Sequence, residues 1–285
     1  MHDLTEKIEP VHRRAFRIIS TSASKEGVDW FLAGALARDW ILTEIYNIDP
    51  LRATFDADLA LALPDWDTFY RLRQLILDSG EFLPDKHGRN HRLDHSIVRG
   101  FHLDLIPYGP LAGEEAKIAW PPTHDTVMNV IGFEDVYRAA ITVLVEADLP
   151  VRVSSPAGLI AMKILAWEDR KYHPQNKDAR DIRLLLDKYE VVAGERLHEE
   201  GGVMVVENFD ADRASARLLG RDVASILTGL ARQRVAFLVD RELGKEGAGG
   251  LIGDLLRMGS DLLYEEENFE RMRSLVQSFR NGFDD

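Results

Sequence analysis

The sequence predicts an α+β protein in which a mixed sheet with flanking helices is followed by a helical C-terminal domain. Short apolar segments that alternate with polar residues dominate residues 28–153, as expected of half-buried strands. Apolar residues at helical spacing dominate from residue 156 onward. Between them, Ser154-Ser155-Pro156 is a strong helix start, because a serine cap precedes a proline at the first helical position. We therefore expect a mixed α/β domain over residues 1–154 and a helical domain over residues 155–285.

The elements follow from periodicity and from turn residues. Apolar residues at helical spacing predict a helix within residues 3–25, and a strand over 28–33 ends at Gly34. A helix over 36–46 is stopped by Asn47-Ile48-Asp49-Pro50, and a second strand covers 58–63. The next elements are a helix from Pro64-Asp65 to Ser79-Gly80, strands near Phe82, at 91–98 and at 101–106, and sheet segments at 136–145 and 151–153. Residues 136–145 fit a helix equally well. The helical domain is expected to contain helices at 156–170, 177–189, 211–218, 221–241, 250–258 and 265–279.

The composition is that of an ordinary globular chain. Of 285 residues, 45% are hydrophobic and 29% are charged, which allows an ample core. The absence of cysteine excludes disulfides and thiolate zinc sites. No apolar segment follows Met1 and no run approaches the length of a membrane span, so we expect a cytoplasmic protein that does not contact membranes.

The charge balance argues against a general polyanion binder. The net charge is −13, with 15 basic against 24 acidic residues in 1–150 and 20 against 24 in 151–285. A nucleic-acid substrate would therefore be contacted through local basic patches and bridging metal ions.

Two neighbouring carboxylates carry the functional prediction. In Asp56-Ala57-Asp58 the period of two sends both acids to one face, while Ala57 and Leu59 point into the core. Two carboxylates side by side are costly unless a cation neutralises them, and hard divalent cations prefer oxygen ligands. The pattern predicts a metal-dependent phosphoryl-transfer site. In FHLDLIP, Asp104 lies on the face opposite Leu103 and Leu105, which makes it the candidate third carboxylate; a solvated edge residue is the alternative.

The segments before the carboxylates offer phosphate contacts. Gly34-Ala35 lies between a strand and a helix, so backbone N–H groups there can face a phosphate. Arg52 and Thr54 either contact phosphate or hold the aspartate strand.

The order of these features resembles a known superfamily. A glycine turn, a helix and Arg52-x-Thr54-x-Asp56-x-Asp58 are similar to the first motif of nucleotidyltransferases with the DNA polymerase β-type fold. The strongest similarity is to the AbiEii/AbiGii toxin family. Asp104, Lys163 in GLIAMKILAWEDR, and Lys177-Asp178-x-x-Asp181 follow in the order that this family shows. The resemblance covers roughly residues 30–189. Ala35 departs from the family, which usually has Gly or Ser there, and the segment from Gly34 to Asp56 is longer.

The resemblance implies a nucleotidyltransferase-type sheet and a helical domain that completes the cleft. It implies that Asp56, Asp58 and Asp104 hold Mg²⁺ or Mn²⁺, and that Lys163 faces the triphosphate of an NTP. It implies nucleotide contacts for Lys177 and Asp178 as well. By the same resemblance the acceptor is an RNA, such as a tRNA end, and the protein is a toxin with a cognate antitoxin protein or part of a phage-defence pair.

Each of these assignments has an alternative. Lys163 lies among apolar residues, where a lysine ordinarily extends to solvent, and acidic residues in the first turn of a helix suit its dipole. The basic segment 86–99 is a phosphate or nucleic-acid contact, a solvated hairpin, or, through His87, His91 and His95, a zinc site. At the level of function, the alternatives are transfer to a small molecule or a protein, a silent nucleotide-binding module of the same fold, and a zinc hydrolase.

Overall fold

The computed structural model describes residues 1–49, 54–172, 177–199, 202–245, 249–257 and 266–285. The chain divides into two compact units, Met1–Ser155 and Pro156–Asp285. Each unit is described by itself below.

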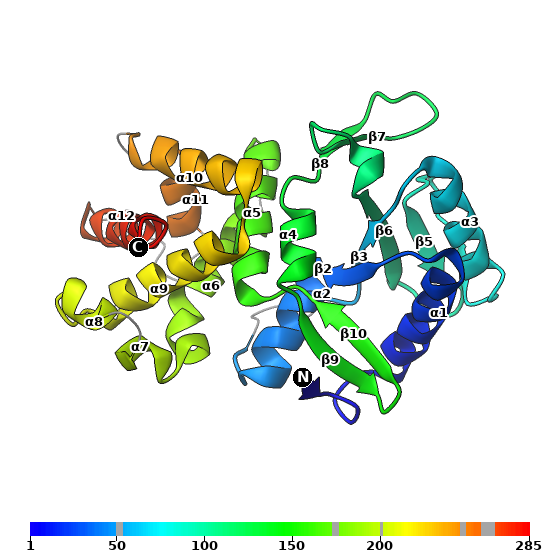
Figure 1. Ribbon diagram of the computed structural model, residues 1–285, viewed down its shortest axis with the longest axis horizontal. Coiled ribbons are helices and arrows are strands. Elements are labelled where there is room, and N and C mark those ends of the chain that lie inside the picture. Colours follow the sequence, from blue (N-terminus) through cyan, green and yellow to red (C-terminus); the bar gives the residue numbers. More distant parts are fainter. Residues whose placement is uncertain (50–53, 173–176, 200–201, 246–248, 258–265) are drawn as a thin grey trace. The chain divides into compact units, whose positions relative to one another are not determined.

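A mixed sheet forms the centre of the first unit (Figure 1). Its eight described strands are β1 (His2–Asp3), β2 (Trp30–Ala33), β3 (Ala57–Ala62), β4 (Phe82–Pro84), β5 (Arg92–His95), β6 (His102–Tyr108), β9 (Ile141–Glu146) and β10 (Leu149–Val153). Their spatial order is β1-β9-β10-β2-β3-β6-β5-β4. β3 and β6 are parallel, whereas β2 and β5 run antiparallel to these two central strands. The short strands β7 (Lys117–Ala119) and β8 (Val127–Asn129) form a separate pair, which follows the 3₁₀ turn Pro110–Ala112.

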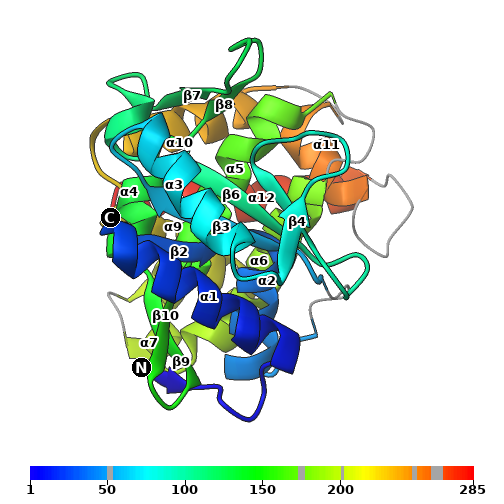
Figure 2. The same cartoon turned by 90° about the vertical axis from the view of Figure 1, so that its right-hand side faces the viewer.

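Helices cover both faces of this sheet. α1 (Pro10–Glu26) and α3 (Trp66–Leu77) lie side by side across one face (Figure 2), where Phe16 stacks on Trp30. On the other face, Phe133 of α4 (Phe133–Arg138) contacts Phe31 and Tyr108. The alternation predicted for β3 is confirmed on the α1 face, since Ala57, Leu59 and Leu61 are fully buried.

Local sequence explains where the helices of this unit begin and end. α1 starts at Pro10, which suits a first turn, and ends at Gly27 in the left-handed conformation. Asp65 caps α3 by accepting a hydrogen bond from the backbone N–H of Thr68 at 2.7 Å. The predicted helix 36–46 is present as α2 (Gly34–Asp39), continued by a π-helical segment, Trp40–Ile45.

In the first unit, the structure resolves one ambiguous prediction and adds one strand that was not predicted. Residues 136–145, which fit a strand or a helix, contain the end of α4 and most of β9. β1 was not predicted, because two residues carry no periodicity; it pairs in parallel with β9.

The second unit is helical, as predicted. Its described helices are α5 (Pro156–Arg170), α6 (Lys177–Ala193), α7 (Arg196–Glu199), α8 (Val203–Val206), α9 (Ala211–Ile226), α10 (Gly229–Leu243), α11 (Gly250–Arg257) and α12 (Glu266–Asn281). The short helices α7 and α8 were not predicted. Among the residues that the structure describes, no helix is long and apolar enough to cross a membrane.

The boundary between α9 and α10 differs from the prediction. Separate helices were expected at 211–218 and 221–241, but α9 continues through Gly220 to Ile226, and the break falls at Leu227-Thr228. A Cβ at Gly220 would overlap the backbone carbonyl oxygen of Phe279, so the glycine lets α9 and α12 approach closely.

Candidate active site

The register of three central strands brings two of the predicted carboxylates together. Asp58 on β3 is the cross-strand partner of Asp104 on the parallel strand β6, and of Ala33 on β2. Both aspartates are half-buried and lie on the face of the sheet opposite the α1 core. Neighbouring strands lie about 4.8 Å apart, so these two side chains leave the sheet side by side.

Asp56 completes the group from the residue before β3. Two steps along an extended chain place its side chain on the same side as that of Asp58. Its Oδ1 atom is buried and has no hydrogen-bond partner among the described residues. A buried carboxylate oxygen without a donor is costly, and a cation is the partner that would satisfy it.

Helices α1 and α2 hold the segment that leads into β3. The backbone N–H of Thr54 donates to Oδ2 of Asp39 at 2.9 Å, and Asp39 is in turn paired with the buried Arg38. His12 of α1 lies with its Nε2 3.3 Å from the carbonyl oxygen of Phe55. These contacts fix the backbone directly before Asp56.

Gly34 is required by its distance from Asp58. It adopts φ +67°, and a Cβ added there would overlap the Asp58 carboxylate, lying 2.9 Å even from the Asp58 Cβ. Only glycine permits both this backbone conformation and this approach. The turn Gly34-Ala35, predicted to face a phosphate, therefore lies against the carboxylate of Asp58 at the start of α2.

Arg92, part of the basic segment 86–99, is an additional member of this group, and its pairing with Asp104 was not predicted. It is the cross-strand partner of Asp104 on β5, and its Nε donates to Asp104 Oδ1 at 2.7 Å. Its Nη2 binds the second oxygen, Oδ2. The hydrogen bond to Asp104 raises the pKa of Arg92, and the charges of Asp104, Asp56 and Asp58 add to this effect although burial opposes it. The guanidinium is therefore within the electrostatic reach of all three carboxylates.

The residues present fit a divalent cation. The donors are carboxylate oxygens, the type that Mg²⁺ and Mn²⁺ prefer, and Asp56 supplies an oxygen that lacks a described partner. Within the described ranges, no three acidic or histidine side chains are already arranged as a complete ligand set. Arg92 engages both oxygens of Asp104 in this structure.

In the second unit, Lys163 and Asp178 form an ion cluster with Asp181 and Arg170. Lys163 on α5 lies 2.6 Å from Asp181 and 3.2 Å from Asp178, both on α6. Arg170 also binds Asp178, at 2.7 Å. The two aspartates are buried and Lys163 is largely so, while Lys177 is exposed. The i, i+3 spacing thus places Asp178 and Asp181 on one face, where Lys163 of α5 binds both.

The other predicted candidates are Thr54, Arg52 and the basic segment 86–99. Thr54 is half-buried, and Arg52 lies outside the described residues. In the basic segment 86–99, Arg89 binds the buried Asp85, and His91 packs against Trp120. His95 accepts hydrogen bonds from the backbone of Ile97 and Val98. Two of the three histidines of the zinc alternative, His91 and His95, thus have different surroundings.

The sequence model of the family described as "Nucleotidyl transferase AbiEii toxin, Type IV TA system" matches residues 17–248. No curated protein gives a significant match.

Several solved structures are distantly similar. An antigenic nucleotidyltransferase-like protein from Paracoccidioides brasiliensis shares 18% identity, with coverage of 61% of this chain and 74% of that chain and a TM-score of 0.40. The antibiotic-resistance factor ANT(2'')-Ia shares 14% identity over 70% of this chain and 97% of that chain, with a TM-score of 0.36. A CCA-adding enzyme from Thermotoga maritima, complexed with tRNA, shares 12% identity over 95% of this chain and 67% of that chain, with a TM-score of 0.27.

These structural likenesses are too distant to support a functional argument. The family match is different in kind, because it spans 232 residues, from 17 to 248, of a chain of 285. It includes the carboxylates of both β3 and β6 and the ion cluster of α5 and α6. This chain is a nucleotidyltransferase that belongs to the AbiEii family of nucleotidyl transferase toxins.

Proposed function

We propose that the protein transfers a nucleoside monophosphate from an NTP to the hydroxyl of an RNA acceptor, such as a tRNA end, and releases pyrophosphate. The observation that carries this proposal is the placement of Asp56, Asp58 and Asp104 on one face of the sheet, with a buried Asp56 oxygen that lacks a described partner. Nucleotidyl transfer needs aligned oxygens and neutralised charge more than covalent help from the protein. A carboxylate cluster of this kind suits that task.

Asp56, Asp58 and Asp104 would hold Mg²⁺ or Mn²⁺. Bound there, the ion would supply Lewis-acid neutralisation of phosphate charge. Asp104 would also accept the proton of the acceptor hydroxyl, since it lies beside Asp58. The backbone of Gly34 and Ala35 would lie along the phosphates, with Thr54 and Arg52 near them.

The second unit would contribute charge to the nucleotide. We propose that residues 1–154 are the catalytic domain and that the helical residues 155–285 complete the cleft. Lys163 and Lys177 would face phosphate, with Asp178 holding Lys163 in place through the 3.2 Å contact. The family description as the toxin of a type IV system supports a cognate antitoxin as a further partner.

The acceptor is the part of the proposal that has a rival. The net charge of −13 favours a small or protein acceptor over a polyanion. RNA remains the proposed acceptor because the protein needs only a local basic surface to contact it. Transfer to a small molecule or a protein is an outcome of the experiment below.

The test is incubation of the purified protein with each α-labelled NTP in turn, with Mg²⁺ or Mn²⁺ and total cellular RNA. Asp56→Ala is the inactive control. Asp94→Asn is the matched control. Asp94 is a carboxylate on β5, two residues after Arg92, and it binds His102 at 2.7 Å. We expect label on a discrete RNA band with the wild type and Asp94→Asn only. Label on protein or on a small product, and none on RNA, would replace the RNA acceptor with one of its rivals.

A further inference from the structure

We infer that Arg92 is the resident counter-ion of the carboxylate cluster and makes metal binding depend on nucleotide binding, by releasing Asp104 when a triphosphate offers it another anion. This inference rests on the proposed function. It assigns a positioning role to one residue of the basic segment 86–99.

The first observation is that Arg92 engages both carboxylate oxygens of Asp104. Its Nε and Nη2 bind the two oxygens of this carboxylate in a fork, the geometry in which a guanidinium binds most strongly. The side chain of Arg92 is 20% exposed and that of Asp104 is 15% exposed, so solvent screens the pair only in part. A cation that needs an oxygen of Asp104 must therefore compete with this fork.

The second observation is that the same guanidinium acts on the other two carboxylates. The charges of Asp56 and Asp58 both stabilise the protonated form of Arg92. With three carboxylates and one guanidinium, the cluster carries a formal charge of about −2, where it would be about −3 without Arg92. Arg92 thus lowers the attraction of the empty cluster for a free divalent ion.

A nucleotide would offer Arg92 an alternative anionic partner. A guanidinium fork binds phosphate oxygens as well as it binds a carboxylate. A metal ion that arrives with an NTP brings three phosphates, whereas a free ion brings none. Arg92 can leave Asp104 at low cost only in the first case, so the third carboxylate becomes available together with the nucleotide.

Neighbouring arginines do not share this position. Arg89, three residues earlier, binds Asp85, whose side chain is 1% exposed and also accepts from the backbone of His87 and Arg89. That pair stabilises the loop before β5. Arg92 alone among the described arginines of this segment is the register partner of Asp104.

The experiment measures the affinity for Mn²⁺ by electron paramagnetic resonance of the free ion, without nucleotide. Arg92→Gln removes the charge and the fork, and Arg92→Lys keeps the charge but removes the fork. We expect Mn²⁺ to bind roughly tenfold tighter to Arg92→Gln than to the wild type, with Arg92→Lys between them. With a non-hydrolysable NTP analogue, the affinity of the wild type is expected to rise more than that of Arg92→Gln.

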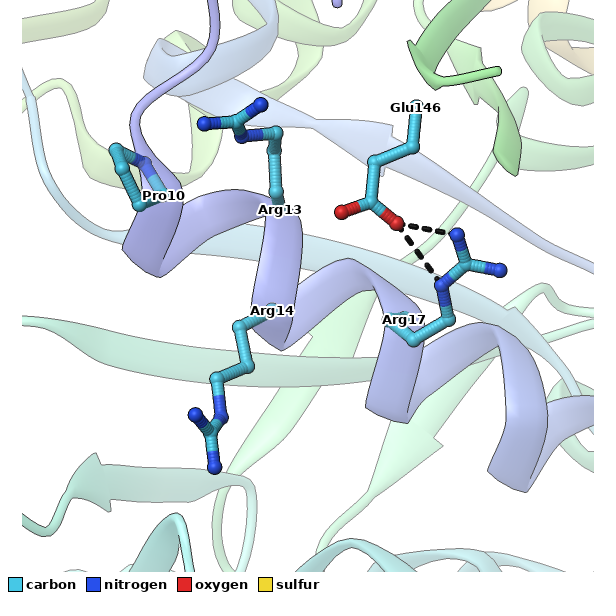
Figure 3. Close-up of a pocket in the computed structure, with 5 residues that line it drawn as sticks. All are labelled: Pro10, Arg13, Arg14, Arg17 and Glu146. Atoms are coloured by element: carbon cyan, nitrogen blue, oxygen red, sulfur yellow. Dashed lines mark hydrogen bonds and ion pairs between the residues drawn. The ribbon is translucent and has the colours of Figure 1, made fainter. Parts of the chain in front are cut away.

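Arg17→Gln is the matched control. Arg17 lies on α1 beside a surface pocket and binds Glu146 at the end of β9 (Figure 3). It also binds Asp148, which follows β9. The Arg17→Gln variant loses the same charge as Arg92→Gln and a similar ion pair. β9 is separated from β6 by three strands, roughly 19 Å at about 4.8 Å per step, which exceeds the screening length of about 8 Å at physiological salt. Its Mn²⁺ affinity should equal that of the wild type.

Equal or weaker Mn²⁺ binding by Arg92→Gln would overturn the inference, because it would make Arg92 a fixed clamp on Asp104. If Arg92→Gln does not fold, Arg92→Lys decides by the same criterion. Failure of the proposed function looks different: Asp58→Asn would then bind Mn²⁺ as the wild type does, whatever the Arg92 variants show.

Discussion

At the scale of single residues, the site depends on the close contact between Gly34 and Asp58. No residue larger than glycine at position 34 would leave room for this aspartate. Gly34 combines a positive φ with contact against the Asp58 carboxylate, so a side chain at residue 34 and a carboxylate at residue 58 cannot occupy their positions together. The chain offers a comparison in Gly27, which has φ +64° and no other atom within 4 Å of an added Cβ. The two glycines separate the cost of the backbone conformation from the cost of the contact.

We predict that Gly34→Ala displaces Asp58 and lowers the rate of nucleotidyl transfer at least about 100-fold, since charge stabilisation at a transferring phosphoryl group is worth several kcal/mol. Gly27→Ala shares the backbone penalty of about 1 kcal/mol but should keep the wild-type rate. Single-turnover transfer and the urea midpoint, measured on both variants, check this. Full activity in Gly34→Ala would show that Asp58 does not need its position.

The sequence predicted which face of the sheet the aspartates occupy, but not which basic residues pair with them. Period-two alternation is a local property, so it was sufficient to place Asp56 with Asp58 and to set Asp104 opposite Leu103 and Leu105. The pairing of Arg92 with Asp104 depends on the register between β5 and β6, which no local pattern contains. The pairing of Lys163 with Asp178 and Asp181 is likewise a tertiary contact between α5 and α6.

At the scale of elements, α1 acts as a support for the segment before β3. His12 is buried, contacts the ring of Phe101 at 5.1 Å, and approaches the Phe55 carbonyl through Nε2. Burial lowers the pKa of His12, against the smaller opposing effects of the Phe55 carbonyl and Glu9. A histidine that is neutral when folded binds fewer protons than the unfolded chain does below its ordinary pKa of about 6.5.

Stability should therefore be complete above about pH 6.5 and fall as the pH decreases below it, by up to about 1.4 kcal/mol per pH unit for each such histidine. Burial lowers the pKa of His91 and His95 in the same direction. We predict that His12→Gln, which keeps a donor for Phe55, has a smaller slope of unfolding free energy between pH 7 and 5.5. Urea titrations at a series of pH values measure it, and the same slope in both proteins would contradict the assignment.

The helical unit depends on a close contact between two helices. Gly220 lies inside α9, where the absence of a side chain lets the backbone of α12 approach. This contact cannot be predicted from a local pattern, in which a glycine within a helical stretch indicates a break. The ambiguity at 136–145 has a similar origin, since a short apolar run fits both periods until its neighbours are known.

We predict that Gly220→Ala destabilises the protein by about 1–3 kcal/mol or more, because the added methyl group overlaps a backbone carbonyl that cannot rotate away. Gly244→Ala is the control. Its added Cβ would meet nothing closer than 3.5 Å, at the carbonyl oxygen of Asp240, and should be neutral or slightly stabilising. Calorimetry of the three proteins distinguishes a packing role for Gly220 from a general effect of glycine replacement.

At the scale of the whole molecule, an acidic chain performs chemistry on polyphosphates. The net charge of −13 opposes the approach of an NTP, and three carboxylates at the site add to this repulsion. In the proposed function a cation at the carboxylates would offset this repulsion, and the guanidinium of Arg92 offsets part of it. The division into units 1–155 and 156–285 separates the carboxylates from the Lys163 cluster along the chain, and both lie within the family match.

The measurement that tests this account most directly is the rate of transfer from an α-labelled NTP as Mn²⁺ is titrated, in the wild type, Asp58→Asn and Asp94→Asn. The account predicts that Asp58→Asn loses transfer by about 1,000-fold at every Mn²⁺ concentration, a loss of about 4 kcal/mol in transition-state stabilisation. Asp94→Asn, which alters a carboxylate bound to His102, should stay within about threefold of the wild type. Equal activity in the wild type and Asp58→Asn, or activity that does not change with Mn²⁺, would contradict it.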